Sequence, residues 1–277
     1  MEQDRPPNSA TRWSKYRYYA RSVAGILGGF REPAAPVKLL VQQHLLRRTT
    51  PRRVITHRST GLRFEVRSFL DVWCLKETLV DRMYERYGFR VQPGWVVVDV
   101  GAAAGDYAVA VAKVDQAGRV LAFEPSPESY GMLVRNLTRN GARNVEPINL
   151  ALSDQVGTLL LDVSGDPVSM GTLTSGQQPR ESTVRIAATT LEKALRERGI
   201  ERCDLLKLDC EGGEYAILAS LDNELLRRID HIVMEYHDVG GRSHREIVER
   251  LEAGGYDVRV VGNPVHRHLG YLAATRR

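Results

Sequence analysis

From Gln92 to the C-terminus, short apolar segments alternate with segments in which apolar residues recur at helical spacing. The apolar segments are 95–100, 119–124, 145–152, 204–209 and 231–237, and the helical ones are 106–114, 126–140, 191–198 and 243–253, with one more that ends at Leu221. Strands buried on both faces of a parallel sheet have continuous apolar sequences, and helices connect them. The pattern therefore predicts an α/β domain, with two further strands at 256–261 and 271–275.

Residues 156–190 break this alternation. Segments 156–162 and 182–187 have strand patterns, and they flank a loop rich in Gly, Ser and Thr at 164–178. A long loop inside a compact domain is usually functional. We therefore predict a loop insertion at 156–190.

The chain before Gln92 has a different organisation. Helical spacing at 37–48, alternation around a turn at 53–66 and helical spacing at 71–87 predict a cap made of helix, β-hairpin and helix. The predicted parts are a basic, partly disordered arm (1–36), this cap (37–91) and the main domain (92–277). Because the cap directly precedes the first core strand, we expect it to cover one end of the ligand-binding site.

The stretch from Trp95 to Gly105 predicts a strand, a narrow turn of small residues and a helix that begins at Asp106. This corner binds phosphates or nucleotides in doubly wound folds. The middle glycine of a dinucleotide fingerprint is absent, and Asp99 suits a ligand with hydroxyls or positive charge rather than phosphates. Gly101 and Gly105 alone would also fit a simple tight turn. However, Glu124 follows about 20 residues later, the spacing at which an acid reaches a ribose diol, so the pattern favours S-adenosylmethionine.

Other polar residues also stand where predicted strands end. Parallel strands present their carboxyl ends at one edge of the sheet, where open α/β folds bind their ligands. We therefore expect these side chains to gather there: Asp99, Glu124, Asp154, Asp209, Glu211, Glu235 and His237.

Composition limits the class of protein. A chain of 277 residues that is 43% hydrophobic can bury one sizeable core. It has no apolar run of about 18 residues that would span a membrane, and cations interrupt every apolar run near the N-terminus. Its three cysteines show neither metal-binding spacing nor an even count, which predicts reduced thiols and a cytoplasmic protein.

Charge is distributed unevenly along the chain. Residues 1–67 hold 14 Lys or Arg and 4 Asp or Glu, a net charge of +10, whereas the remainder has a net charge of −5. Within the basic part, aromatic residues and cations interleave from Trp13 to Tyr19. This pattern suits peripheral contact with a membrane surface or a nucleic-acid backbone. It is equally compatible with a solvated extension that packs loosely on the core.

Several motifs resemble the FkbM-type family of S-adenosylmethionine-dependent methyltransferases. They are Val98 to Gly105, Ala122 to Pro127, Asn149 to Asp154, Thr190 to Glu192, Leu206 to Glu214 and Met234 to His237. The block around Lys207, with acids and glycines ahead of a helix, is the most specific. Two positions depart from the family pattern, which usually has Asn at Ala103 and Asp at Glu192.

The resemblance implies a Rossmann-like class I methyltransferase fold, with helices on both faces of a seven-stranded, mostly parallel sheet whose last strand is antiparallel. It also implies O-methylation of a hydroxyl on a small molecule, such as a sugar or a glycosylated or polyketide natural product. The turn would hold the methionine part of the cofactor, Glu124 the ribose and Asp154 the adenine. The expected cofactor-binding residues are Asp99, Gly101, Ala102, Ala103, Gly105, Tyr107, Glu124, Pro125, Ser126, Ser153, Asp154 and Asp209.

Methyl transfer to an alcohol needs a group that removes the hydroxyl proton. We favour His237 as the base, because imidazole titrates near neutral pH, with Glu235 or Asp209 orienting it. His237 would alternatively be a polar residue at a strand end. Asp209, Glu211, Glu235 and His237 would also suit Mg²⁺ or another divalent ion that acidifies the alcohol. Lys207 would either pair with an acid or bind the cofactor or acceptor.

Three other functions were considered. An RNA methyltransferase would use the basic arm, but enzymes that methylate base amines usually carry an Asn/Asp-Pro-Pro-aromatic turn where this chain has Asp209 to Gly212. A nicotinamide oxidoreductase would need a second domain for its substrate. A non-catalytic binding module is the third alternative, and failure to bind S-adenosylmethionine would favour it.

Overall fold

The computed structural model describes the chain except for residues 1–11, 42–51, 163–170 and 175–182. Its centre is a seven-stranded sheet in the order β12-β13-β11-β10-β3-β4-β5. The strands are β3 (Val96–Val100), β4 (Arg119–Phe123), β5 (Val145–Ile148), β10 (Cys203–Leu208), β11 (Ile229–His237), β12 (Tyr256–Gly262) and β13 (Leu269–Arg276). Within this sheet, β13 runs antiparallel to the other six strands, which share one direction. The predicted fold class and its antiparallel last strand are confirmed.

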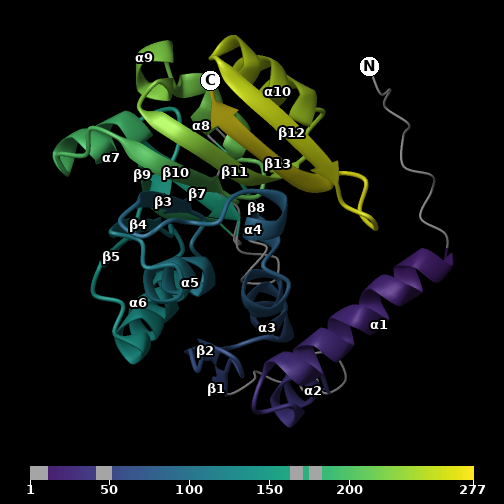
Figure 1. Cartoon of the computed structure of the whole chain (residues 1–277). Coiled ribbons are helices and arrows are strands. Elements are labelled where there is room, and N and C mark those ends of the chain that lie inside the picture. The colour runs from purple at the N-terminus through teal and green to yellow at the C-terminus, as the bar shows by residue number, and fades with distance from the viewer. Residues whose placement is uncertain (1–11, 42–51, 163–170, 175–182) are drawn as a thin grey trace.

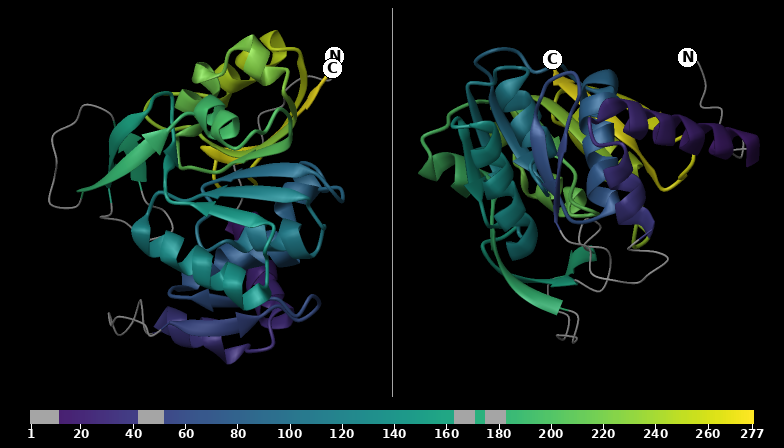
Figure 2. Two further views of the ribbon diagram at one scale, coloured as in Figure 1. Left: turned by 90° about the vertical axis from the view of Figure 1, so that its left-hand side faces the viewer. Right: turned by 90° about the horizontal axis from the view of Figure 1, so that it is seen from below.

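Helices cover both faces of this sheet (Figures 1 and 2). One face packs on α5 (Asp106–Lys113) and α6 (Pro127–Asn140), and the other on α7 (Leu191–Glu197), α8 (Glu214–Ser220), α9 (Asn223–Leu226) and α10 (His244–Ala253). Successive residues of a strand serve opposite faces, as expected from its pleat. Val97 and Leu205 belong to the first core, whereas Val98 and Leu206 belong to the second.

The insertion builds a second sheet. It has the order β6-β9-β7-β8, from β6 (Ala151–Leu152), β7 (Gly157–Asp162), β8 (Gly171–Thr174) and β9 (Thr183–Thr189). The sequence predicts one strand over 145–152. The structure divides it, because β6 leaves the main sheet to pair with β9. Most of the predicted loop 164–178 lies outside the described residues.

The N-terminal elements pack against the α5 and α6 side of the sheet (Figure 1). They are α1 (Arg12–Gly29), α2 (Ala34–Leu40), β1 (Arg53–Thr56), β2 (Arg63–Val66), α3 (Phe69–Leu75), the π-helix η2 (Lys76–Val80) and α4 (Met83–Tyr87). Strands β1 and β2 form the predicted hairpin. Asn136 of α6 fixes it, accepting a hydrogen bond from the Glu65 amide at 2.7 Å and donating to the Glu65 carbonyl at 3.2 Å.

Two N-terminal predictions differ from the structure. The predicted basic, partly disordered arm (1–36) contains the regular helix α1, whose Ile26 is buried. The single helix predicted at 71–87 is divided into α3, η2 and α4, and the chain turns at Arg82, which adopts a left-handed φ of 49°. A Ser68–Asp71 capping box begins α3. No helix in the described part of the chain combines the length and apolarity needed to cross a bilayer.

Candidate active site

A cavity of about 800 Å³ lies at the carboxyl edge of the main sheet. The ends of β3, β4, β10 and β11 line its base, and residues of α1 to α4, of β6 and β7, and of the loop before β13 line its walls. Sites for drug-sized ligands measure roughly 300–1,000 Å³. The cavity therefore has room for a small-molecule ligand, and the N-terminal elements close one of its sides.

The turn after β3 is held against the ends of two neighbouring strands. The amides of Gly101 and Ala102 donate to the Phe123 carbonyl at 3.0 and 2.9 Å. Gly101 has a φ of 76°, and a Cβ placed there would lie 1.8 Å from the carbonyl oxygen of Asp209. Glycine is therefore required both by the backbone conformation and by the close approach of β10.

Glu124 follows β4 and faces the cavity beside this turn. One carboxylate oxygen accepts the Ala103 amide at 2.8 Å and the other accepts the Ser126 amide at 2.9 Å. Burial raises the pKa of Glu124 to about 7 despite these two hydrogen bonds. Because a carboxylate oxygen can accept more than one hydrogen bond, Glu124 retains the capacity to accept from ligand hydroxyls.

Lys207 connects the turn with the end of β10. Its Nζ lies 2.9 Å from Asp99 Oδ1 and 3.8 Å from Asp209 Oδ2, and it donates to the Gly101 carbonyl at 3.0 Å. Burial alone would lower the pKa of Lys207, but the charges of Asp99 and Asp209 raise it. Asp99 is fully buried and does not line the cavity. Of the two roles considered for Lys207, the structure shows the pairing with acids.

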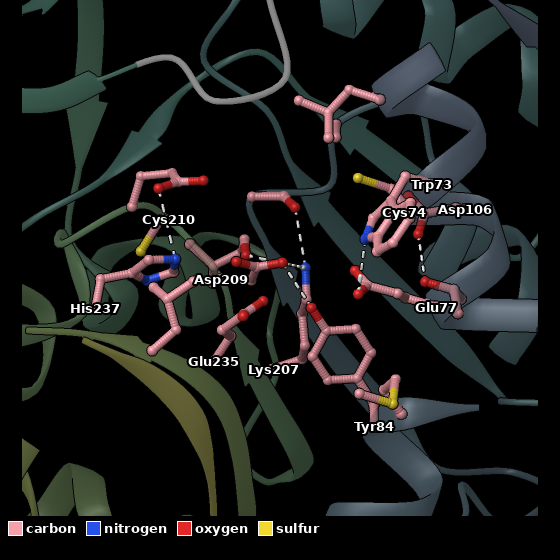
Figure 3. A pocket seen from close by; sticks show the side chains of 18 of the residues that line it. Trp73, Cys74, Glu77, Tyr84, Asp106, Lys207, Asp209, Cys210, Glu235 and His237 are labelled. Carbon is pink, nitrogen blue, oxygen red and sulfur yellow. Dashed lines mark hydrogen bonds and ion pairs between the residues drawn. The ribbon is translucent and has the colours of Figure 1, made fainter. Parts of the chain in front are cut away.

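Three carboxylates face the other half of the cavity (Figure 3). Asp209 Oδ2 accepts a hydrogen bond from the Tyr84 hydroxyl at 2.6 Å, and Glu77 Oε1 accepts one from the Trp73 indole at 2.9 Å. Burial, reinforced by Asp209, raises the pKa of Glu77 to about 7. Burial, Asp209 and Glu77 raise the pKa of Glu235 well above its usual range. These three carboxylates favour a ligand with positive charge in this half of the cavity.

His237 ends β11 beside two further acids. Its Nδ1 lies 3.3 Å from Glu214 Oε1 and its Nε2 lies 3.5 Å from Glu211 Oε2. Burial disfavours the imidazolium, but the hydrogen bond with Glu214 and the surrounding carboxylate charges outweigh it and raise the pKa of His237 to about 10. The ring is therefore protonated at neutral pH. In that form it can neither accept a proton nor ligate a metal ion.

Asp209, Glu235 and His237 each place one potential ligand atom within 4.8 Å of the others. This group contains three of the four residues predicted to bind a metal ion. Glu211 is directed to His237 Nε2 and lies outside the group. The predicted base and both residues proposed to orient it thus lie together in one cavity.

Comparison with known proteins identifies the family. Residues 99–258, more than half of the chain, match the model of the methyltransferase FkbM domain. The chain belongs to this family. It is therefore an S-adenosylmethionine-dependent methyltransferase, as its motifs predict.

Two relatives and one structure illustrate the family. The chain is 29% identical over 220 residues to the 31-O-demethyl-FK506 methyltransferase FkbM of Streptomyces tacrolimicus, covering 69% of this chain and 83% of that protein. It is 23% identical over 176 residues to the hexuronic acid methyltransferase AglP of Haloferax volcanii, and this match covers 63% of this chain and 70% of that protein. The structure of methyltransferase FkbM from Methylobacillus flagellatus aligns with a TM-score of 0.47 and 13% identity, and the alignment covers 74% of this chain and 54% of that chain.

The FkbM motifs contribute to the cavity unequally. The expected cofactor-binding residues that line it are Gly101, Ala103, Glu124, Pro125 and Asp209. Those buried behind the turn, or beside it, are Asp99, Ala102, Gly105, Tyr107 and Ser126. Ser153 and Asp154 hydrogen-bond to each other at 2.9 Å and do not line the cavity, whereas their neighbours Ala151 and Leu152 do.

The N-terminal cap contributes to this FkbM-family site as expected, but its sequence did not indicate which side chains would face the cavity. Glu77, Trp73 and Tyr84 line the cavity together with Tyr271 of β13. The apolar spacing of 71–87 indicated burial of the aromatic residues, but it gave no sign that Glu77 would face a cavity. The only available signal was the acid itself within an apolar helical pattern.

Proposed function

We propose that this protein transfers a methyl group from S-adenosylmethionine to a hydroxyl of a small molecule, either a sugar or a glycosylated or polyketide natural product. The main observation is that one cavity contains both the glycine turn with Glu124 and the carboxylates that end β10 and β11. The acceptor class is supported by the relatives, which are named for a 31-O-demethyl-FK506 substrate and for hexuronic acid.

The residues at the turn fit the cofactor. S-adenosylmethionine supplies a methyl group on a positively charged sulfur, which needs no further activation. Gly101 and Ala103 would cradle its amino-acid part, and Glu124 would accept hydrogen bonds from the ribose hydroxyls. Asp99 would act through Lys207, which holds the Gly101 carbonyl at 3.0 Å.

We assign removal of the acceptor proton to Glu235. Its carboxylate faces the cavity, and burial with the neighbouring charges of Asp209 and Glu77 raises its pKa, which makes it a stronger base than an exposed carboxylate. As the acceptor oxygen bonds to the methyl carbon, the hydroxyl proton passes to Glu235 and the electron pair of the broken carbon–sulfur bond stays on sulfur. Asp209, fixed by Tyr84, would orient the acceptor. Protonated His237 would position the loop that carries Glu211 and Glu214.

Methyl transfer by matched variants tests this assignment. Glu235→Gln should lower kcat by about 10²–10⁴-fold, the usual contribution of a general base, while calorimetry shows unchanged binding of S-adenosylmethionine. His237→Gln should have a smaller effect, and Glu252→Gln on the exposed side of α10 should have none. A larger loss for His237→Gln than for Glu235→Gln would make His237 the base.

The same assay tests a metal-dependent mechanism. If Glu235 acts as the base, treatment with EDTA should leave the rate unchanged. Loss of activity in EDTA, with recovery on adding Mg²⁺, would instead assign the group of Asp209, Glu235 and His237 to a metal ion. Failure of the purified protein to bind S-adenosylmethionine would contradict the proposed function.

A further inference from the structure

Exposed apolar side chains concentrate on the N-terminal helices. Among the described residues, eight of the twelve exposed large hydrophobic side chains belong to α1, α2 and the residue that follows α2. We call them the α1–α2 face: Trp13, Tyr16, Tyr19, Val23, Leu27, Val37, Leu40 and Val41. Trp13 is 76% exposed and Tyr16 is 69% exposed. Large apolar patches that remain exposed usually mark interaction sites.

The exposed side chains of α1 lie on a different side of the helix from those that pack on the rest of the protein. Ile26 is 2% exposed, and the hydroxyl of Ser22, also buried, accepts a hydrogen bond from Lys76 Nζ at 3.0 Å. The exposed residues of α1 recur every three or four positions, which places them along one stripe of the helix. Figure 1 and the right view of Figure 2 show α1 at the edge of the molecule.

The stripe is bordered by positive charge. Residues 12–41 contain six Lys or Arg and a single acid, Glu32, which accepts hydrogen bonds from Thr56 at 2.7 and 2.9 Å. Lys15, Arg17 and Arg21 are exposed on α1. A helix with Trp, Tyr and aliphatic residues beside Lys and Arg binds the interface of an anionic bilayer, where the rings enter the headgroup region and the cations contact anionic lipids.

The two helices meet at the cavity. Tyr19 and Val23 of α1 and Leu40 of α2 belong to the exposed face and also line the cavity. A partner that covers the α1–α2 face therefore lies next to the entrance of the candidate active site.

We infer that the α1–α2 face docks on an anionic lipid bilayer, with its aromatic and aliphatic side chains inserted at headgroup depth and its cations on the lipid phosphates. Docking orients the cavity entrance toward the lipid surface. The inference depends on the exposed side chains and their charge, and it holds whichever acceptor the enzyme methylates.

Cosedimentation of the full-length protein with vesicles tests the inference. The protein should bind vesicles of phosphatidylcholine with about one-third phosphatidylglycerol, and bind pure phosphatidylcholine at least about tenfold more weakly. Trp13→Ser combined with Tyr16→Ser should reduce binding to the anionic vesicles about tenfold. The matched control, Val184→Ser with Val260→Ser, removes exposed apolar side chains elsewhere and should leave binding unchanged.

Fluorescence identifies the inserted residue. Anionic vesicles should shift the tryptophan emission to the blue, and Trp13→Phe should abolish the shift while retaining binding. Equal binding to both types of vesicle, no binding, or unchanged binding by the double variant would overturn the inference. The inference would also be overturned if the wild type self-associated and the double variant lost this self-association instead of vesicle binding. Salt-dependent binding of RNA to this face, without binding to vesicles, would overturn it as well.

Discussion

The two halves of the cavity are built in different ways. The half that we propose binds the cofactor, called the cofactor half, is mostly backbone: the turn from Gly101 to Gly105, bonded to the end of β4 and supported by the buried carboxylate of Glu124. The half that we propose binds the acceptor, called the acceptor half, is made of side chains from distant parts of the chain, among them Glu77, Tyr84 and Glu235. Lys207 and Asp209 contact both halves.

This difference affects how each half tolerates change. A site made of backbone depends on local conformation, so that glycine positions and strand ends determine it. A site made of side chains can be altered residue by residue without changing the fold. We therefore expect substitutions in the cofactor half to affect stability and cofactor binding together, whereas those in the acceptor half change ionisation and acceptor choice.

The largest effect is expected where the halves join. Lys207→Met removes the cation between Asp99 and Asp209 and leaves two carboxylates close together in the interior. Breaking a buried ion pair from one side costs about 3–5 kcal/mol, which urea unfolding at neutral pH would measure. Adding Asp99→Asn should recover part of this loss.

The matched control for this change is Lys193→Met. Lys193 lies on the surface of α7, 3.8 Å from Glu197, and losing such a pair costs about 0–1 kcal/mol. Equal destabilisation by the two lysine variants would show that Lys207 does not hold the halves together.

The next effect concerns the turn alone. Gly101→Ala places a Cβ 1.8 Å from the Asp209 carbonyl oxygen at a φ of 76°. Gly61→Ala has nearly the same φ, 73°, with no atom within 4 Å of the new Cβ. The control should lose about 1–2 kcal/mol from left-handed strain, whereas Gly101→Ala should lose at least about 3 kcal/mol and its cofactor affinity. Similar unfolding free energies would mean that β3 and β10 can separate at little cost.

These expectations reflect what the sequence could and could not predict. The strand–helix alternation predicted the sheet, and the spacing of Gly101, Gly105 and Glu124 predicted the cofactor corner, because local backbone geometry depends on local sequence. Glu77 could not be predicted to face the cavity, because its position depends on the π-helix η2 and on how η2 packs against α1 and α5. His237 was recognised as a cavity residue, but its charge depends on neighbours such as Glu214.

The acceptor half, like the cofactor half with Glu124, contains a buried carboxylate whose pKa is raised to about 7. Glu77 has a pKa raised from 4.5 to about 7, so the folded protein binds more protons than the unfolded chain between these values. Stability should therefore fall as pH rises from about 4.5 to 7 and stay lower above that. Glu77→Gln removes this cost and can still accept the Trp73 hydrogen bond. It should be more stable than the wild type by about 3 kcal/mol at pH 8.

Chemical denaturation of both proteins between pH 4 and 8 measures this change. The two stability curves should converge near pH 4, where Glu77 is protonated in both the folded and unfolded states. Glu192→Gln on exposed α7 is the control and should follow the wild type throughout. A Glu77→Gln curve parallel to that of the wild type would show that water in the cavity already solvates the carboxylate.

The smallest predicted effect is a gain at Ala103 in the cofactor half. Ala103 has a φ of 44°, a conformation that Asn adopts more readily than Ala, and the FkbM-type pattern usually has Asn here. Ala103→Asn should raise the unfolding free energy by up to about 1 kcal/mol and tighten binding of S-adenosylmethionine. Gln116→Asn, at a φ of 59° away from the cavity, should give a similar gain in stability without changing affinity. If both variants gain stability and neither changes affinity in calorimetry, the turn binds the cofactor through its backbone alone, and the side chain at this position contributes only to folding.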